Sequence, residues 1–372
     1  MPDAAGPVVV AMDATPLLGV RTGVGASVAG FLNAVATDPH LDVIGFGLSA
    51  RGGRALPECL PDSVRSGRRV PIPAGALLRM WGRVDHPAVE LWTGPVDVVH
   101  GTNFVVPPSR TAARLVTVHD LTPLRFPELC NPTSLRYPSL IARAVDQGSS
   151  IHTVSQAIAD DVMDHFQVDA DRVHVIHNGL TRLENLHQRA KGEPPYILAI
   201  GTVEPRKGLP DLVAAFDRIA GTIPDLTLKI VGPPGWGEDD LAAAIRTARH
   251  AARIHRIGWS DDRSSLIAGA HLLAYPSLYE GFGLPPLEAM SLGVPVVTTT
   301  AGAIPEVVGD AAVLVPPRDV TALAEALLLV SRDATTRERL ITAGTQRVTQ
   351  FTWEAAGHQL ARLYRALAGS RS

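Results

Sequence analysis

Two glutamates, Glu280 and Glu288, flank a Gly-Phe-Gly turn and two prolines in the stretch PSLYEGFGLPPLEAM, residues 276–290. Carboxylates accept hydrogen bonds from hydroxyl groups, and a helix that begins at the prolines favours a phosphate at its N-terminus. This pattern predicts a ligand with hydroxyl groups on both sides of a diphosphate, such as a sugar nucleotide. The alternative is structural: Glu288 only complements the helix dipole, and the glycines only turn the chain.

Two adjacent cations, Arg206 and Lys207, follow a strand-like run in the stretch TVEPRKG, residues 202–208. Lys207 is one of three lysines in the chain. Two cations at the end of a strand can hold a diphosphate and stabilise its negative charge as it departs. The alternative is a solvated pair of surface charges.

Further candidates also follow predicted strands. TVHDLTP, residues 117–123, places His119 beside Asp120, where a ligand contact competes with the role of a buried structural histidine. RTGVGAS, residues 21–27, contains Gly23 and Gly25 in a predicted tight turn before a helix. In the second half of the chain, Gly232 and Trp259 end strand-like runs.

Short β-branched runs alternate with amphipathic stretches, as in doubly wound α/β domains with parallel sheets. Strands are predicted to start at residues 8, 41, 97, 114, 150 and 172 and, beyond a polar linker at 178–195, at 196, 226, 253, 271, 294 and 311. Helices are predicted at 25–36, 134–146, 156–165 and 353–367. Ligands of such folds bind at the carboxyl ends of the strands.

We therefore expect two Rossmann-like domains, at 1–180 and 181–350, that face a central cleft. The last segment, 351–372, either packs on the second sheet or crosses back to the first domain. A chain of 372 residues with 46% hydrophobic content is long enough for two cores.

The composition argues against several classes of protein. A net charge of −3 without a long basic block disfavours nucleic acid as a partner. Cys59 and Cys130 lack disulfide-framework or metal spacing, which favours a reducing cytoplasm. No apolar stretch approaches the roughly 18 residues of a spanning helix, and the first six residues lack signal-peptide features. We expect a cytoplasmic protein, either soluble or peripheral at the inner face of the plasma membrane.

Taken together, the motifs resemble glycosyltransferase family 4, the retaining nucleotide-sugar transferases of GT-B fold, over nearly the whole chain. The family signature stands here as Glu280, Gly281, Phe282, Gly283, Leu284 and Glu288. EPRKG resembles the family's EPRKN, with Gly208 in place of asparagine.

The resemblance implies a role for each candidate. Arg206 and Lys207 would hold the donor diphosphate, Glu280 the hydroxyl groups of the donor sugar and Glu288 the ribose. His119 would meet the donor sugar. Further donor contacts would come from residues around the phosphates and the nucleobase: Gly23, Gly25, Gly232, Trp259 and the loop Gly281–Leu284.

The motifs look most like the mannosyltransferase branch, which implies GDP-mannose as donor and a saccharide or lipid-linked saccharide as acceptor. UDP-sugars and other nucleotide-sugars stay open. The family works without a bound metal, so catalysis is expected in a chelator and no cofactor is expected. Ala26 stands where many relatives of that branch have an arginine, so acceptor contacts by such an arginine are not expected.

Two other functions compete with this one. A GT-B epimerase or phosphorylase would turn over the donor without an added glycosyl acceptor. A non-catalytic subunit would keep the nucleotide cleft and bind a nucleotide without transfer.

A basic segment, residues 51–83, has seven arginines against two acidic residues. Leu77, Leu78, Met80 and Trp81 lie at its end, and if exposed they would join the arginines in contacting an anionic membrane. The alternative is a solvated loop followed by a helix that faces the core.

Overall fold

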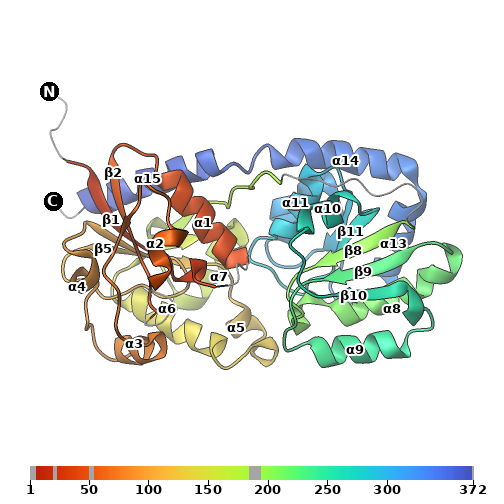
Figure 1. Cartoon of the computed structure of the whole chain (residues 1–372), viewed down its shortest axis with the longest axis horizontal. Coiled ribbons are helices and arrows are strands. Elements are labelled where there is room, and N and C mark those ends of the chain that lie inside the picture. The colour runs from red at the N-terminus through yellow and green to blue at the C-terminus, as the bar shows by residue number, and fades with distance from the viewer. Residues whose placement is uncertain (1–5, 20–22, 50–53, 184–193, 371–372) are drawn as a thin grey trace. The chain divides into compact units, whose positions relative to one another are not determined.

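The computed structural model describes residues 6–19, 23–49, 54–183 and 194–370. The chain forms two compact units, which Figure 1 shows with their helices and strands. Unit 1 comprises Met1–Thr181 and Phe351–Ser372, and unit 2 comprises Arg182–Gln350. The C-terminal segment therefore belongs to unit 1.

Unit 1 contains a sheet of seven parallel strands in the order β3-β2-β1-β4-β5-β6-β7. Its strands are β1 (Val8–Asp13), β2 (Leu41–Phe46), β3 (Arg65–Ser66), β4 (Val98–Gly101), β5 (Ala113–Val118), β6 (Ser150–Thr153) and β7 (Val173–Val175). Six of the seven were predicted. The exception is β3, which has two exposed residues and is too short to show an apolar pattern.

Helices cover both faces of this sheet because successive strand residues point to opposite faces. On one face, Val10 and Met12 of β1 pack with α1 and α15; on the other, Ala11 packs with α3. The helices of unit 1 are α1 (Gly23–Val35), α2 (Leu56–Cys59), α3 (Ala74–Trp81), α4 (Glu90–Thr93), α5 (Thr122–Arg125), α6 (Tyr137–Asp146), α7 (Gln156–Phe166) and α15 (Trp353–Gly369). Ser155 caps α7, accepting a hydrogen bond from the backbone N–H of Ile158.

Helix α15 lies against α1 through small residues. A Cβ atom at Gly30 would lie 2.1 Å from the ring of Trp353, and one at Gly357 would lie 2.6 Å from Ala34. The hydroxyl group of Tyr364 is hydrogen-bonded to Nδ1 of His100, on β4, at 2.6 Å. These contacts tie the last helix into the core of unit 1.

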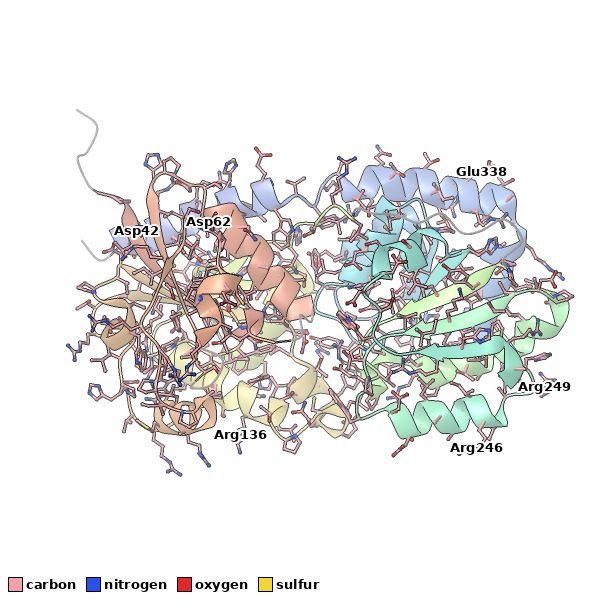
Figure 2. The ribbon with its side chains drawn as sticks, viewed as in Figure 1. Asp42, Asp62, Arg136, Arg246, Arg249 and Glu338 are labelled. Atoms are coloured by element: carbon pink, nitrogen blue, oxygen red, sulfur yellow. The ribbon has the colours of Figure 1, made fainter. Side chains whose placement is uncertain are left out.

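Unit 2 contains a six-stranded parallel sheet in the order β10-β9-β8-β11-β12-β13. All six strands were predicted, and they are β8 (Tyr196–Ile200), β9 (Thr227–Val231), β10 (Ile254–Ile257), β11 (Leu272–Tyr275), β12 (Val296–Thr299) and β13 (Ala312–Val315). Its helices are α8 (Leu209–Ile219), α9 (Glu238–Thr247), α10 (Arg263–Ala268), α11 (Leu284–Ser291), α12 (Ile304–Val308), α13 (Val320–Arg332) and α14 (Ala334–Val348). Charged side chains such as Arg246, Arg249 and Glu338 are exposed on these helices and the turns beside them (Figure 2).

Of the two alternatives for the apolar residues after the basic segment, the structure supports a helix that faces the core. Leu77 and Trp81 are buried in the core of unit 1, and the indole N–H of Trp81 donates to the carbonyl of Pro87 at 3.1 Å. Met80 is exposed, at 38%. Helix α3 therefore faces the core, which removes the apolar half of the proposed membrane contact; residues 51–53 lie outside the described part.

Among the described residues, no helix combines the length and apolar composition needed to cross a bilayer. Cys59 and Cys130 form no disulfide bond. Most of the predicted linker, residues 184–193, lies outside the described ranges.

Candidate active site

The predicted cations and the first signature glutamate meet at the carboxyl edge of the unit 2 sheet. Strands β8 and β11 are neighbours, so the turn after β8 and the loop after β11 lie at the same edge. Arg206 Nη1 lies 2.8 Å from Glu280 Oε2, and Lys207 Nζ lies 2.6 Å from Glu280 Oε1. Arg206 Nε also pairs with Glu204 at 2.8 Å. Two cations and two carboxylates thus form one ionic cluster.

The last residue of β11, Tyr275, completes this cluster and was missed by the sequence analysis. Its hydroxyl group accepts a hydrogen bond from Lys207 Nζ at 2.8 Å, and Nζ lies 4.9 Å from the ring centroid. Lys207 therefore donates to both Tyr275 and Glu280, which fixes the position of its ammonium group. No sequence motif marks Tyr275, because a tyrosine in a buried strand is typical of a core residue.

Burial and charge set the ionisation of the cluster. Burial would raise the pKa of Glu280, but Arg206 and Lys207 lower it to about 2. Burial and the neighbouring Arg206 lower the pKa of Lys207, and Glu280 opposes that shift. Burial, then the charge of Glu280, hold the pKa of Tyr275 well above its usual value. Glu280 is ionised at neutral pH, and Tyr275 stays a neutral phenol.

Two glycines allow the surrounding turns to approach this cluster closely. Gly208 has φ +62°, and a Cβ atom there would lie 2.3 Å from the carbonyl oxygen of Pro276. The N–H of Leu278 donates to the carbonyl of Arg206 at 2.7 Å across the same gap. Gly302 has φ +56°, and a Cβ atom there would lie 2.3 Å from the carbonyl oxygen of Glu280. Gly208 is thus a structural requirement of the cation turn.

The remaining signature residues form the entry to α11. Gly281 and Phe282 are buried, and Gly283, with φ +108°, precedes Leu284, the first residue of the helix. Prolines follow at positions 285 and 286, as predicted. They carry no N–H group, so the first three residues of α11 offer one backbone donor, at Leu284. The expected phosphate site at this helix end is therefore weaker than its position suggests.

Glu288, on α11, has a partner of its own. Arg263, at the start of α10, donates to its carboxylate. Burial raises the pKa of Glu288, and Arg263 partly offsets that effect. The two signature glutamates therefore lie in different electrostatic environments. The sequence gave no sign of Arg263, because 25 residues separate it from Glu288.

Two predicted donor-binding residues follow β9 and β10. Gly232 has φ +148°, and a Cβ atom there would lie 2.0 Å from the carbonyl oxygen of Gly201, so close packing of the strand ends requires glycine. Trp259 is 53% exposed, and its indole N–H donates to Asp261 at 2.9 Å. An exposed, oriented indole ring is able to stack on a ligand.

His119 lies at the carboxyl edge of the unit 1 sheet, after β5. Its Nε2 is 2.8 Å from the carbonyl of Thr102, and the ring of Phe104 packs edge-on against it with centroids 5.8 Å apart. Burial lowers the pKa of His119, while Thr102 and Asp120 oppose the shift. The imidazole is therefore neutral near pH 7, donating through Nε2.

The glycine motif differs from its prediction. Gly23 and Gly25 lie in the first turn of α1 itself, rather than in a turn before it. Arg21 and Thr22 lie outside the described residues.

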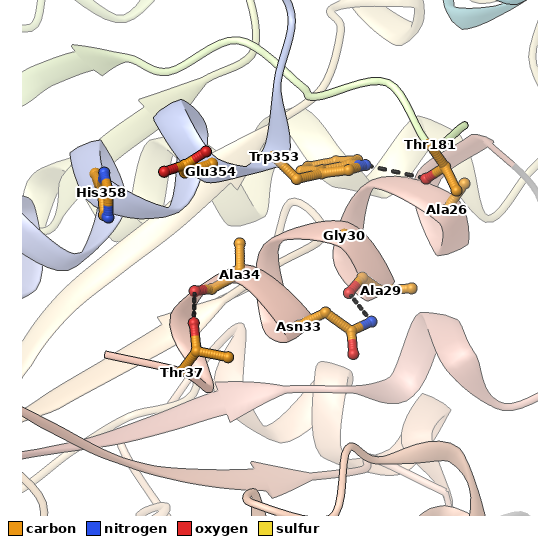
Figure 3. Close-up of a pocket in the computed structure, with 10 residues that line it drawn as sticks. All are labelled: Ala26, Ala29, Gly30, Asn33, Ala34, Thr37, Thr181, Trp353, Glu354 and His358. Carbon is orange, nitrogen blue, oxygen red and sulfur yellow. Dashed lines mark hydrogen bonds between the residues drawn. The ribbon is translucent and has the colours of Figure 1, made fainter. Parts of the chain in front are cut away.

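A surface pocket lies between α1 and α15 (Figure 3). Three of its polar side chains are used internally: Thr181 accepts from the indole of Trp353, Asn33 donates to the carbonyl of Ala29, and Thr37 donates to that of Ala34. Ala26 lines it as well. None of the predicted site residues does, and we assign the pocket no role.

Within the described ranges, no group of three or more histidine, cysteine, aspartate or glutamate side chains is arranged to hold a metal ion. The chain contains one Asp-X-Asp triplet, Asp169 to Asp171, a spacing that can ligate a metal. Both side chains are exposed, at a short 3-10 turn before β7. We assign them no metal.

Comparison with known proteins covers both halves of the chain. The model of the family "Glycosyl transferases group 1" matches residues 183–347, and that of "Glycosyltransferase Family 4" matches residues 22–181. The chain is 32% identical over 302 residues to O-antigen chain mannosyltransferase B of Escherichia coli, covering 77% of this chain and 79% of that protein.

Two other similarities extend over most of the chain. It is 29% identical over 339 residues to phosphatidyl-myo-inositol mannosyltransferase of Mycobacterium tuberculosis, covering 84% of this chain and 86% of the relative. The solved structure of sucrose-phosphate synthase from Thermosynechococcus elongatus matches with a TM-score of 0.75 at 21% identity, covering 98% of this chain and 100% of the other. This structural match supports the GT-B fold.

Proposed function

The chain belongs to glycosyltransferase family 4, and we propose that it transfers mannose from GDP-mannose to a saccharide or lipid-linked saccharide, with retention of anomeric configuration and without a metal ion. One observation carries the proposal: Arg206, Lys207 and Glu280 form a buried cluster at the carboxyl edge of a parallel sheet. The mannosyltransferase names of the two relatives support the choice of sugar.

In this proposal, Arg206 and Lys207 bind the donor diphosphate. The bond between the anomeric carbon and the diphosphate oxygen breaks, and its electron pair stays on that oxygen. Two fixed cations stabilise the developing charge without reorganisation, which is the main way a site of this kind lowers the barrier. No protein nucleophile is needed, because the acceptor hydroxyl attacks from the same face and the departing diphosphate takes its proton.

Glu280 is placed to accept hydrogen bonds from hydroxyl groups of the donor sugar. In the ligand-free protein its two oxygens are occupied by Arg206 and Lys207. Each carboxylate oxygen keeps a further lone pair, so Glu280 can accept from the sugar while both cations stay in place. We propose that Glu288 accepts from the ribose hydroxyl groups and that His119 contacts the transferred sugar.

The remaining donor contacts are proposed on the same resemblance. The loop Gly281–Leu284 and the glycines of α1, Gly23 and Gly25, would approach the phosphates. Gly232 and Trp259 would lie beside the nucleobase. For Trp259 the support is its exposed indole ring, held by Asp261.

The test is a thermal titration with GDP, UDP, ADP and TDP, each with and without EDTA. A ligand that binds the native state raises its melting temperature, by an amount that grows with concentration over Kd. We expect GDP to give the largest increase and EDTA to leave it unchanged. Transfer from GDP-mannose is then followed as GDP release with an acceptor, and the product's anomeric configuration is read by NMR.

Each result separates the proposal from its rivals. A larger response to UDP changes the donor class but not the reaction. Donor turnover that does not depend on acceptor indicates an epimerase, a phosphorylase or hydrolysis. Loss of activity in EDTA, restored by a divalent cation, contradicts metal independence.

A further inference from the structure

Two buried polar atoms at the carboxyl edge of unit 1 have no hydrogen-bond partner among the described residues: Asn103 Oδ1, after β4, and Thr122 Oγ1, after β5. An unpaired buried acceptor is costly, and most such atoms in native proteins have partners. Strands β4 and β5 are neighbours, so both atoms belong to the edge that carries His119.

A chain of hydrogen bonds fixes His119 at this edge. Thr102 donates its hydroxyl to the carbonyl of Asp13 at 2.7 Å, and the carbonyl of Thr102 accepts from His119 Nε2 at 2.8 Å. A carbonyl accepts but cannot donate, so Nε2 carries the proton and Nδ1 of the neutral ring carries a lone pair. The described residues provide no partner for Nδ1.

The groups left over at this edge therefore mainly accept hydrogen bonds. Asn103 Oδ1 and His119 Nδ1 are acceptors, and Thr122 Oγ1 both accepts and donates. A sugar hydroxyl can donate to each of them. A phosphate oxygen at neutral pH has no proton to donate, so it gains nothing from Asn103 Oδ1 or His119 Nδ1, and only the amide N–H of Asn103 and the hydroxyl of Thr122 can donate to it.

The negative charge of Asp120 at this edge also favours a neutral ligand over a phosphate. Burial and then the carboxylate of Asp120 raise the pKa of Tyr137, and Asp120 also acts on His119. Asp120 would repel a phosphate, whereas it leaves a neutral ligand unaffected. Asn103 is only partly buried, so a rotation of its side chain brings the amide oxygen to a ligand.

We propose that the acceptor is a neutral saccharide, whose hydroxyl groups are bound by Asn103 and Thr122, and that acceptors with a phosphate at this position are disfavoured. This rests on the proposed glycosyl transfer. It names the chemical class of one substrate of that reaction.

The experiment compares acceptors at one fixed donor, chosen as the nucleotide-sugar whose nucleotide stabilises the protein most. The neutral probes are the α-1,2-, α-1,3-, α-1,4- and α-1,6-linked mannobioses. The charged probes are mannose 6-phosphate and myo-inositol 1-phosphate. We expect at least one mannobiose to be glycosylated with a kcat/KM about tenfold or more above that of either phosphate. Equal or better use of a phosphate, or no use of any mannobiose, overturns the proposal.

Two variants test the residues. Asn103→Ala and Thr122→Val are each expected to lower kcat/KM for the mannobiose about three- to tenfold, with KM for the donor unchanged. Because both atoms are unpaired in the free protein, the melting temperature should stay the same or rise. A variant that raises KM for the donor but leaves kcat/KM for the mannobiose unchanged contradicts the assignment of its residue to the acceptor.

A matched control lies at the same edge. Thr102 is as buried as Thr122, but its hydroxyl is paired with Asp13, so Thr102→Val should lower the melting temperature where Thr122→Val does not. If Thr122→Val lowers the melting temperature as much as Thr102→Val does, then the hydroxyl of Thr122 has a structural role, and its assignment to the acceptor is overturned. Nucleotide stabilisation and donor hydrolysis are measured in every variant. If the wild-type protein shows neither nucleotide stabilisation nor donor hydrolysis, the proposed function fails, and the acceptor class is not what the experiment has contradicted.

Discussion

The carboxyl edges of the two sheets differ in kind, although both sheets are parallel and doubly wound. In unit 2 the edge is ionic: Arg206 and Lys207 both contact Glu280. In the described part of unit 1 the edge has no such ion pair at His119: the neutral imidazole donates to a backbone carbonyl, and the charge that acts on it is the carboxylate of Asp120. The same architecture therefore supports two chemistries, and the side chains that follow the strands decide which.

This difference matches the two substrates of a glycosyl transfer, a charged donor and an acceptor hydroxyl group. A diphosphate is strongly charged and its charge grows as it leaves, so fixed cations in a buried site stabilise it. A hydroxyl group is neutral, and buried neutral acceptors select it at little electrostatic cost. Charge is thus concentrated at the edge that we propose binds the donor.

The largest expected effect is the removal of a cation from the ionic edge. Lys207→Ala should lower kcat by roughly 100- to 1000-fold, because it removes one of two groups that stabilise the leaving diphosphate. It should also lower the melting temperature, since Glu280 keeps one cation fewer. Steady-state kinetics and calorimetry measure both. A kcat within threefold of wild type would remove Lys207 from the mechanism.

Much of this edge was predictable. Arg206, Lys207 and Glu280 follow strand-like runs in the sequence, and neighbouring parallel strands bring such residues to one edge. Tyr275 and Arg263 were not predictable, because one looks like a core residue and the other meets Glu288 only through the packing of α10 on α11.

The points that the sequence left open or got wrong have one cause. For Leu77 and Trp81 the sequence left a core and a membrane surface open, because side-chain spacing along one helix cannot distinguish the two. Gly23 was expected before a helix that starts at residue 25, but the helix in fact includes it. Contacts distant in sequence decide such cases, and a single sequence does not reveal them.

The second prediction concerns acid stability at the ionic edge. The pKa of Glu280 falls from 4.5 to about 2 in the folded protein. A lowered carboxyl pKa contributes stability above 4.5 that is lost as pH falls toward 2, on the order of 3 kcal/mol. Glu280→Gln removes this dependence. The difference in melting temperature between wild type and variant should therefore shrink between pH 4.5 and 2.

The neutral edge should lose stability in a different pH window. His152 on β6 lies in a hydrogen-bonded row with Thr117 and the carbonyl of Ile176. Burial lowers its pKa from 6.5 to about 4. The unfolded chain then takes up the proton first, so this contribution is present above pH 6.5 and is lost as pH falls toward 4. The difference in melting temperature between wild type and His152→Gln should therefore shrink as the pH falls from 6.5 to 4. If the differences in melting temperature for Glu280→Gln and His152→Gln shrink over the same pH range, the contrast between the two edges is wrong.

The smallest effect tests how Lys207 is held. Tyr275→Phe keeps the ring but removes the hydroxyl that accepts from Lys207 Nζ. An acceptor stabilises the ammonium form, so its loss should lower the pKa of Lys207 and move the alkaline limb of the kcat/KM profile to lower pH. We also expect kcat to fall by up to about tenfold.

Tyr196 is a matched control for this change. It is a second buried tyrosine on the same sheet, with Lys229 Nζ 3.8 Å from its ring centroid and a hydroxyl that donates to the carbonyl of Leu266. Tyr196→Phe should lower the melting temperature without moving the alkaline limb. If Tyr275→Phe changes only the melting temperature as well, then its hydroxyl supports the fold and Glu280 alone positions the lysine. A shift of the limb in Tyr275→Phe alone means that the ionic edge depends on a neutral side chain to keep its cation charged.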